Sequence, residues 1–229
     1  MVTVAQARPD ERAQFIQRTY THLAGAVGAF IVLEFLFFQT GIAEAVTNFV
    51  VSSRFTWLGI LGAFALLGWL SRELAAKADS VQTQYIGLGI YVVAEALIFA
   101  PLLYIASVFS DASVIPTAAI LTLLLFGGLT TVAFTTKKDF SFLGGILKIG
   151  GFVALGLIVC SVLFGFTLGL FFSVAMVAFA SAAILYDTSK IMHHYSKHQY
   201  VAASLELFAS VALLFWYVLR IVMALSSRR

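Results

Sequence analysis

Seven long apolar stretches, separated by short polar connections, dominate the pattern of the chain. A helix needs about 20 apolar residues to cross a hydrocarbon core of ~30 Å. The stretches are continuously apolar, whereas a membrane-spanning strand would alternate over about 10 residues. Helices also satisfy their own backbone hydrogen bonds in lipid. The pattern therefore predicts seven transmembrane helices, near residues 20–38, 55–70, 85–109, 114–134, 142–164, 166–186 and 201–225.

These stretches define one membrane domain, residues 20–225. It lies between a polar N-terminal segment, residues 1–19, and a short basic tail, residues 226–229. The connections are too short to hold a folded domain outside the membrane. We therefore expect an all-α fold, that of a polytopic membrane protein with a single seven-helix domain.

Composition agrees with this class and excludes others. Apolar residues make up 61% of the chain and charged residues 11%, against about 45–50% and about 25% in soluble domains. Cys160 is the only cysteine, which excludes an internal disulfide and a cysteine-based zinc site. The net charge is only +3 and the basic residues form no cluster, so a nucleic acid is not an expected partner.

Lys and Arg are concentrated in alternate connections. The opposite connections carry only Arg54. Because cytoplasmic loops are enriched in Lys and Arg, we expect a cytoplasmic N-terminus. Seven spans then place Arg228 and Arg229 outside, and a re-entrant last segment is the alternative. The basic residues on the cytoplasmic side would be Arg8, Arg12, Arg18, Arg72, Lys77, Lys137, Lys138, Lys190 and Lys197.

Glu95 lies near the middle of the third stretch, six residues before Pro101. A charged residue inside a membrane is costly and is a functional candidate by default. Proline removes a backbone hydrogen bond one turn upstream, which leaves a polar carbonyl free. We interpret Glu95 as part of the wall of a polar cavity. A protonated, hydrogen-bonded structural carboxyl is the alternative.

A second candidate site combines Asp187, at the end of the sixth stretch, with Glu206, at the start of the seventh. Both should lie toward the cytoplasmic side and can approach each other. Two carboxylates in a poorly solvated site cannot both ionise at low cost, so one keeps a proton or a cation such as calcium binds between them. The alternative is a helix-capping role with contacts to Lys190.

The other ionisable residues of the apolar stretches carry weaker signals. Lys148 and Arg220 have stems long enough to bring their charges to an interface. Glu34 could face either a crevice or a polar partner. The histidines of the last connection lack the residues of a zinc enzyme, and we interpret them as interfacial; they are His193, His194 and His198.

Several sequence motifs point to one family. The most specific are FGGLT at 126–130, TKKDFSFLGG at 136–145 and LYDTSKI at 185–191. Glu95 with Pro101, and Glu206 within the last stretch, fit the same pattern. On these residues the chain resembles the Bax inhibitor-1 (transmembrane BAX inhibitor motif) family, and its bacterial YccA-like branch in particular, over most of its length.

The resemblance implies a seven-helix membrane protein whose last helix is enclosed by the other six. In several members it implies a pH-sensitive calcium leak that two aspartates on helices six and seven govern. Asp187 matches the first aspartate, but Ser210 stands at the position of the second. YccA-like members also tend to lack the second aspartate, and they are associated with restraining a membrane-anchored AAA protease.

Two hypotheses follow. The first is a pH-sensitive passive cation (calcium) leak in a bacterial inner membrane, with Asp187 at the gate, Glu206 replacing the acid absent at Ser210, and Glu95 along the path. The second is a non-transporting regulator that binds other membrane proteins, such as a membrane-anchored AAA protease. A leak requires the three acids to face one cavity, whereas a regulator does not. We expect neither enzymatic activity nor a cofactor, calcium being a permeant or bound ion at Asp187 and Glu206.

Overall fold

The computed structural model describes residues 3–77, 80–136 and 138–227, apart from the side chain of Arg54. Lys137, Arg228 and Arg229, which the orientation argument used, lie outside the described residues. The helices are η1 (Val4–Gln6), α1 (Pro9–Gln39), α2 (Ile42–Val51), α3 (Arg54–Ala75), α4 (Val81–Phe109), α5 (Val114–Thr136), α6 (Leu143–Phe164), α7 (Gly169–His193) and α8 (Tyr200–Ser226).

Seven of these helices are long and apolar enough to cross a membrane, which confirms the predicted fold class. The first helix begins earlier than expected, because Pro9 starts α1 within the polar N-terminal segment. Proline is favoured in the first turn, where its missing N–H is not needed, and Asp10 and Glu11 suit the positive end of the helix dipole. Much of the segment 1–19 therefore extends the first span.

The short helix α2 was missed by the sequence analysis, which expected only a connection there. It has 10 residues and is too short to cross the membrane. Gly41 separates it from α1 with a φ of 76°, a left-handed conformation that glycine adopts without a steric penalty. Ala43 and Thr47, one turn apart, are buried, and α2 packs against α4.

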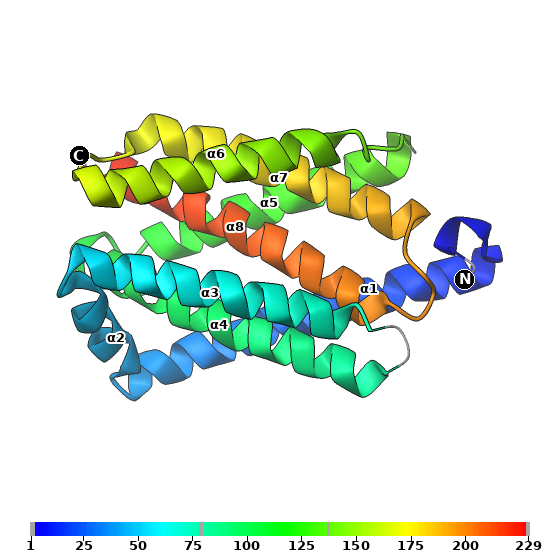
Figure 1. Cartoon of the computed structure of the whole chain (residues 1–229), viewed down its shortest axis with the longest axis horizontal. Helices are drawn as coiled ribbons and strands as arrows, with labels where there is room; N and C mark the ends of the chain where they lie inside the picture. Colours follow the sequence, from blue (N-terminus) through cyan, green and yellow to red (C-terminus); the bar gives the residue numbers. More distant parts are fainter. Residues whose placement is uncertain (1–2, 78–79, 137, 228–229) are drawn as a thin grey trace.

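The last segment is one uninterrupted helix. At 1.5 Å per residue, the 27 residues of α8 extend for roughly 40 Å. Its C-terminal end lies at the opposite end of the bundle from η1 (Figure 1). A re-entrant segment would reverse direction inside the membrane, and α8 does not. The structure therefore supports seven spans over the re-entrant alternative.

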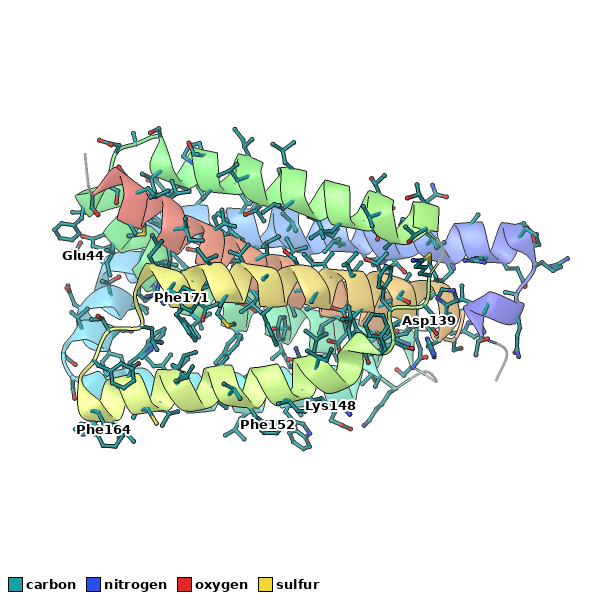
Figure 2. The ribbon with its side chains drawn as sticks, turned by 90° about the horizontal axis from the view of Figure 1, so that it is seen from above. Glu44, Asp139, Lys148, Phe152, Phe164 and Phe171 are labelled. Atoms are coloured by element: carbon teal, nitrogen blue, oxygen red, sulfur yellow. The ribbon has the colours of Figure 1, made fainter. Side chains whose placement is uncertain are left out.

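Helices α4 and α8 form the centre of the bundle. In the most apolar 18-residue stretch of each helix, 56% of the residues of α4 and 44% of those of α8 are buried, against 6% of those of α6. Helix α8 packs against α1, α3, α4, α5 and α7, which enclose it on most sides (Figure 1). Helix α6 packs chiefly against α7 and also contacts α3. It lies at one edge of the bundle, with α5 at the opposite edge (Figure 2).

The N-terminus packs against the connection between α7 and α8. The backbone N–H of Val4 donates to the carbonyl oxygen of Tyr195 at 2.9 Å, and the Lys197 ammonium lies 3.2 Å from the Glu11 carboxylate. This end of the bundle also holds Asp139, whereas Glu44 of α2 lies at the other end (Figure 2). The cytoplasmic orientation of this end stays a prediction from charge.

Replacing Gly87 with Ala should destabilise the protein, because α3 and α4 approach most closely there. A Cβ on Gly87 would lie 2.5 Å from the carbonyl oxygen of Ser71 and 2.8 Å from the backbone nitrogen of Ala75. Overpacking of this kind costs about 1–3 kcal/mol. The control is Gly89→Ala on the same helix, where a Cβ meets nothing within 4 Å. Thermal unfolding in detergent should show a lower Tm for Gly87→Ala only; equal Tm values would contradict the close contact.

Candidate functional site

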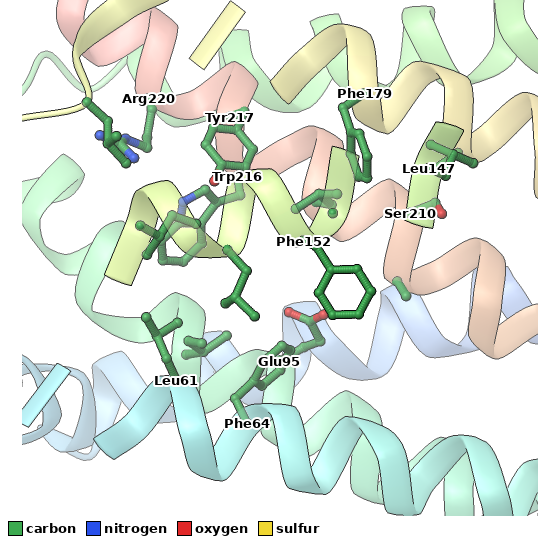
Figure 3. Close-up of a pocket in the computed structure, with 18 of the residues that line it drawn as sticks. Leu61, Phe64, Glu95, Leu147, Phe152, Phe179, Ser210, Trp216, Tyr217 and Arg220 are labelled. Carbon is green, nitrogen blue, oxygen red and sulfur yellow. The ribbon is translucent and has the colours of Figure 1, made fainter. Parts of the chain in front are cut away.

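A cavity of about 1040 Å³ lies within the bundle, with walls from α3, α4, α6, α7 and α8. Its surface is mainly apolar and aromatic, with a few polar and charged side chains (Figure 3). Such a composition is typical of binding sites, in which apolar walls hold a ligand and a few polar groups orient it. The aromatic residues include Trp57, Phe64, Phe99, Phe152, Phe179 and Trp216.

All four residues predicted for the ion path line this cavity. Glu95 projects from α4, Asp187 from α7, and Glu206 and Ser210 from α8. Glu95, Asp187 and Ser210 are buried, while the Glu206 side chain is 28% exposed. The structure therefore meets the geometric condition that the leak hypothesis sets, that the three acids face one cavity. Their roles stay predictions.

Asp187 is paired with Ser210, the position at which the resemblance implies a second aspartate. The Ser210 hydroxyl donates a hydrogen bond of 2.6 Å to Oδ2 of Asp187. This bond joins α7 to α8 in the buried interior of the bundle. A hydrogen bond to a buried carboxyl offsets part of its desolvation cost. At this position serine supplies a donor where the family's aspartate would supply a second acid.

Glu206 has a different partner from the expected one. Nε of Arg72, in the last turn of α3, donates to Oε2 of Glu206 at 3.3 Å. The Arg72 guanidinium also lies 5.6 Å from the centre of the Tyr91 ring, a cation–π distance. The expected pairing of Glu206 with Asp187 is therefore replaced by two separate contacts, Asp187 with Ser210 and Glu206 with Arg72.

Sequence reasoning missed Arg72 as a site residue because it placed the end of the second span at residue 70. Helix α3 continues to Ala75, and Ser71 and Ala75 are fully or almost fully buried. These two residues are one helical turn apart, and this spacing could have indicated that the second span continues to residue 75. Tyr91 was also missed, although it lies one turn before Glu95 on α4 and lines the same cavity.

The structure does not show the alternative role given for Asp187, which was helix capping with contacts to Lys190. Asp187 lies inside α7, six residues before the helix ends at His193, so it caps neither end. Among the described residues, Asp187 forms no ion pair with Lys190. The Lys190 ammonium instead lies over the rings of Tyr186 and Tyr195, at 5.3 and 5.4 Å.

The remaining charged and histidine candidates lie in different parts of the structure. Arg220 and Lys148 border the cavity, on α8 and α6, and the Arg220 guanidinium lies 5.9 Å from the centre of the Tyr217 ring. Glu34 of α1 is buried elsewhere, and its two oxygens have no hydrogen-bond partner among the described residues. His193 bonds through Nδ1 to the carbonyl oxygen of Ser189 at the end of α7.

Two of the sequence motifs contact each other beside the site. Oδ1 of Asp139 accepts hydrogen bonds from the backbone N–H of Ser141 (2.9 Å) and from the hydroxyl of Ser189 (3.1 Å). The Ser141 N–H in particular holds the pKa of the Asp139 carboxyl below its usual range. The backbone N–H of Phe140 donates to the Ser189 hydroxyl in turn. These contacts fix the connection before α6 against α7, close to Asp187.

The donor atoms at the site do not form a resident metal centre. Among the described residues, no group of three or more His, Cys, Asp or Glu is placed to hold a metal ion. Asp187 and Glu206 supply two carboxylates, and Glu206 is already paired with Arg72. Calcium prefers 6–8 oxygen ligands. Calcium as a ligand of Asp187 and Glu206 stays a prediction.

Fold and cavity together define an integral, polytopic helical membrane protein with ionisable residues in an intramembrane cavity. The family described as "Inhibitor of apoptosis-promoting Bax1" matches the chain over residues 12–228. The chain therefore belongs to the Bax inhibitor family, and the resemblance drawn from the motifs is confirmed.

Three relatives show how broad this family is. The chain is 34% identical to an uncharacterised protein of Pseudomonas aeruginosa, over 71% of this chain and 63% of the relative. It is 32% identical to Bax inhibitor 1 of Schizosaccharomyces pombe, over 72% and 61%. It is 30% identical to the modulator of FtsH protease YccA of Escherichia coli, over 81% and 83%. The chain thus spans less than two thirds of the length of the first two relatives.

Replacing Ser210 with Ala should destabilise the fold more than a matched change elsewhere on α8. The change leaves the buried Asp187 carboxyl without its donor, at a cost of about 1–3 kcal/mol. The control is Ser204→Ala, because the buried Ser204 hydroxyl bonds only to the carbonyl oxygen of Val201 in its own helix. Thermal unfolding in detergent measures both. A Tm for Ser210→Ala no lower than that for Ser204→Ala would contradict a stabilising bond.

Proposed function

We propose that the protein is a passive, pH-sensitive cation leak of the bacterial inner membrane, with calcium as a permeant ion. The observation that carries the proposal is the common cavity: Glu95, Asp187 and Glu206 come from three helices and line one space. Carboxylates inside a membrane that face a shared cavity mark ion paths in many proteins. Neither a nucleophile motif nor a phosphate loop in the sequence favours an enzyme.

The cavity runs along α8 from Glu206 to Arg220. These residues are 14 positions apart, or roughly 21 Å along the helix. An ion that entered at the Glu206 end would meet Asp187 and then Glu95. The cavity therefore covers much of the ~30 Å core that an ion must cross.

In this proposal the ion pair between Arg72 and Glu206 controls the end of the cavity that we expect to face the cytoplasm. The guanidinium places a fixed positive charge where a cation would enter, and it neutralises one of the attracting acids. Release of Arg72 would remove that repulsion and leave Glu206 free to face the ion. At the other end, the rings of Trp57 and Trp216 line the cavity and stack on each other with centroids 6.3 Å apart.

Protonation is the second control on the path. A protonated carboxyl carries no charge and attracts a cation only weakly, so the charge of the path depends on pH. In this chain the hydroxyl of Ser210 cannot ionise, so it offers Asp187 a hydrogen bond in place of a second acid. Two facing acids would couple their titrations and change the pH response.

Reconstitution of Ser210→Asp tests the leak directly. Two facing acids should bind a divalent cation more tightly, by about tenfold or ~1.4 kcal/mol, and should make calcium flux depend more steeply on pH. Asp187→Asn should remove both effects, alone and combined with Ser210→Asp. Calcium flux into proteoliposomes across a pH series measures the response. Unchanged flux at every pH in Ser210→Asp would mean that this region is structural.

The regulator is the second candidate function, and a specific observation favours it. The Escherichia coli relative, of which the chain covers 83%, is named a modulator of FtsH protease. By this likeness the present protein would bind a membrane-anchored AAA protease through the outer faces of its helices. The cavity acids would then only stabilise the bundle.

A degradation assay separates the two functions. If the protein is a regulator, adding it to vesicles that contain an FtsH-type protease should slow the cleavage of a membrane substrate several-fold. Glu95→Gln should slow it equally, since Glu95 is buried and cannot touch a partner. If the protein is a leak, the same Glu95→Gln variant should change calcium flux while it folds normally. An unchanged cleavage rate with the parent protein would exclude the regulator.

A further inference from the structure

The cavity is larger and more apolar than a path for a single ion requires. Its volume of about 1040 Å³ lies at the upper limit of the range for small-molecule sites, about 300–1,000 Å³. Asp187 and Glu206 lie toward one end of it, and the part toward Arg220 is formed mainly by aromatic and aliphatic side chains. Among them are Leu61 and Trp216 (Figure 3), and Trp57, whose ring stacks on that of Trp216. Such a surface favours an apolar occupant in that part.

One wall of the cavity borders the outside of the bundle. Helix α6 forms this wall at the edge of the bundle (Figure 2). The ring of Phe152 points into the cavity and is 77% exposed, so other side chains do not fill the space around it (Figure 3). Helix α6 packs chiefly against α7 and makes only limited contact with α3. Because hydrocarbon surrounds the bundle at this depth, an acyl chain can reach the cavity between α3 and α6 without crossing water.

A cation at the outer part of the cavity has no acidic partner. Arg220 lines the cavity, and among the described residues it forms no ion pair, its guanidinium lying over the Tyr217 ring. It lies six residues, or roughly 9 Å, before the end of α8, a depth from which its side chain reaches the headgroup region. A guanidinium binds phosphate through paired, charge-assisted hydrogen bonds.

We propose that this cavity binds one phospholipid with an anionic headgroup, its phosphate on Arg220 and one acyl chain between α3 and α6. The length of roughly 21 Å between Arg220 and Glu206 exceeds half of the ~30 Å hydrocarbon core, so a chain of one leaflet fits. Asp187 and Glu206 then lie beyond the chain end, and Glu95 lies beside the chain, next to Phe152 (Figure 3). A bound chain would occupy the route of an ion and hold the leak closed.

The three tryptophans of the chain make the site measurable. Trp57 and Trp216 line the cavity, whereas Trp69 of α3 is 63% exposed and does not line it. Trp57→Phe with Trp69→Phe leaves Trp216 as the only reporter. Trp57→Phe with Trp216→Phe leaves Trp69, which faces bulk lipid. Acyl chains that carry bromine quench tryptophan fluorescence on contact.

Each reporter protein is placed in vesicles that contain the same low fraction of brominated phosphatidylglycerol, which is anionic, or brominated phosphatidylcholine, which is not. Trp216 should show a preference of about tenfold for the anionic lipid, equivalent to ~1.4 kcal/mol. Trp69 should show none. Arg220→Gln should remove the preference, while Arg220→Lys should keep part of it. Lys138→Gln, at an exposed position that does not line the cavity, should keep all of it.

Equal quenching of Trp216 by the two lipids, or no quenching at all, would overturn the proposal. So would a preference that survives Arg220→Gln. Should Arg220→Gln fail to fold, mass spectrometry of lipid that purifies with the parent protein decides, because the proposal requires an enriched anionic phospholipid. Both measurements work without an ion gradient, so their failure would leave the leak proposal standing.

Discussion

The structure depends on how it accommodates charge inside a membrane. An unpaired charged side chain at the bilayer centre costs about 2.5–3.5 kcal/mol even on insertion scales. This chain pairs two of its three cavity acids across helices, Asp187 with Ser210 and Glu206 with Arg72. The two pairs join α3, α7 and α8 at one end of the bundle. The same contacts that lower the cost of the acids therefore also hold the helices together.

The position of α6 decides what the bundle can contain. Because α8 packs against α1, α3, α4, α5 and α7 while α6 rests chiefly on α7, space remains between α6 and the centre. Gly144 and Gly150 let α6 approach the rings of Tyr186 and Phe179 on α7 closely. The bundle is thus tightly packed on one side of α8 and open on the other, and the cavity exists because of this asymmetry.

The proposed ion route and the proposed lipid site overlap in one space. Asp187 and Glu206 lie toward one end of it, Glu95 lies in its middle, and Arg220 lies at its outer part (Figure 3). A protein built in this way can be closed to ions by an ion pair at one end and by a lipid chain at the other. Binding to a protease would use the outer surface and would leave the route and the site unchanged.

The sequence by itself determined seven membrane helices, their order and the membership of a family. It also singled out Glu95, Asp187, Glu206 and Ser210, which line one cavity and whose roles stay predictions. Hydropathy and motif spacing are local properties, and the cost of charge in lipid singles out buried acids without any knowledge of packing. Only the tertiary structure decided the partners. Arg72 and Glu206 are separated by 134 residues, and their contact depends on how α3 lies against α8. The cavity and its opening beside α6 likewise depend on helix packing, which no single stretch of sequence encodes.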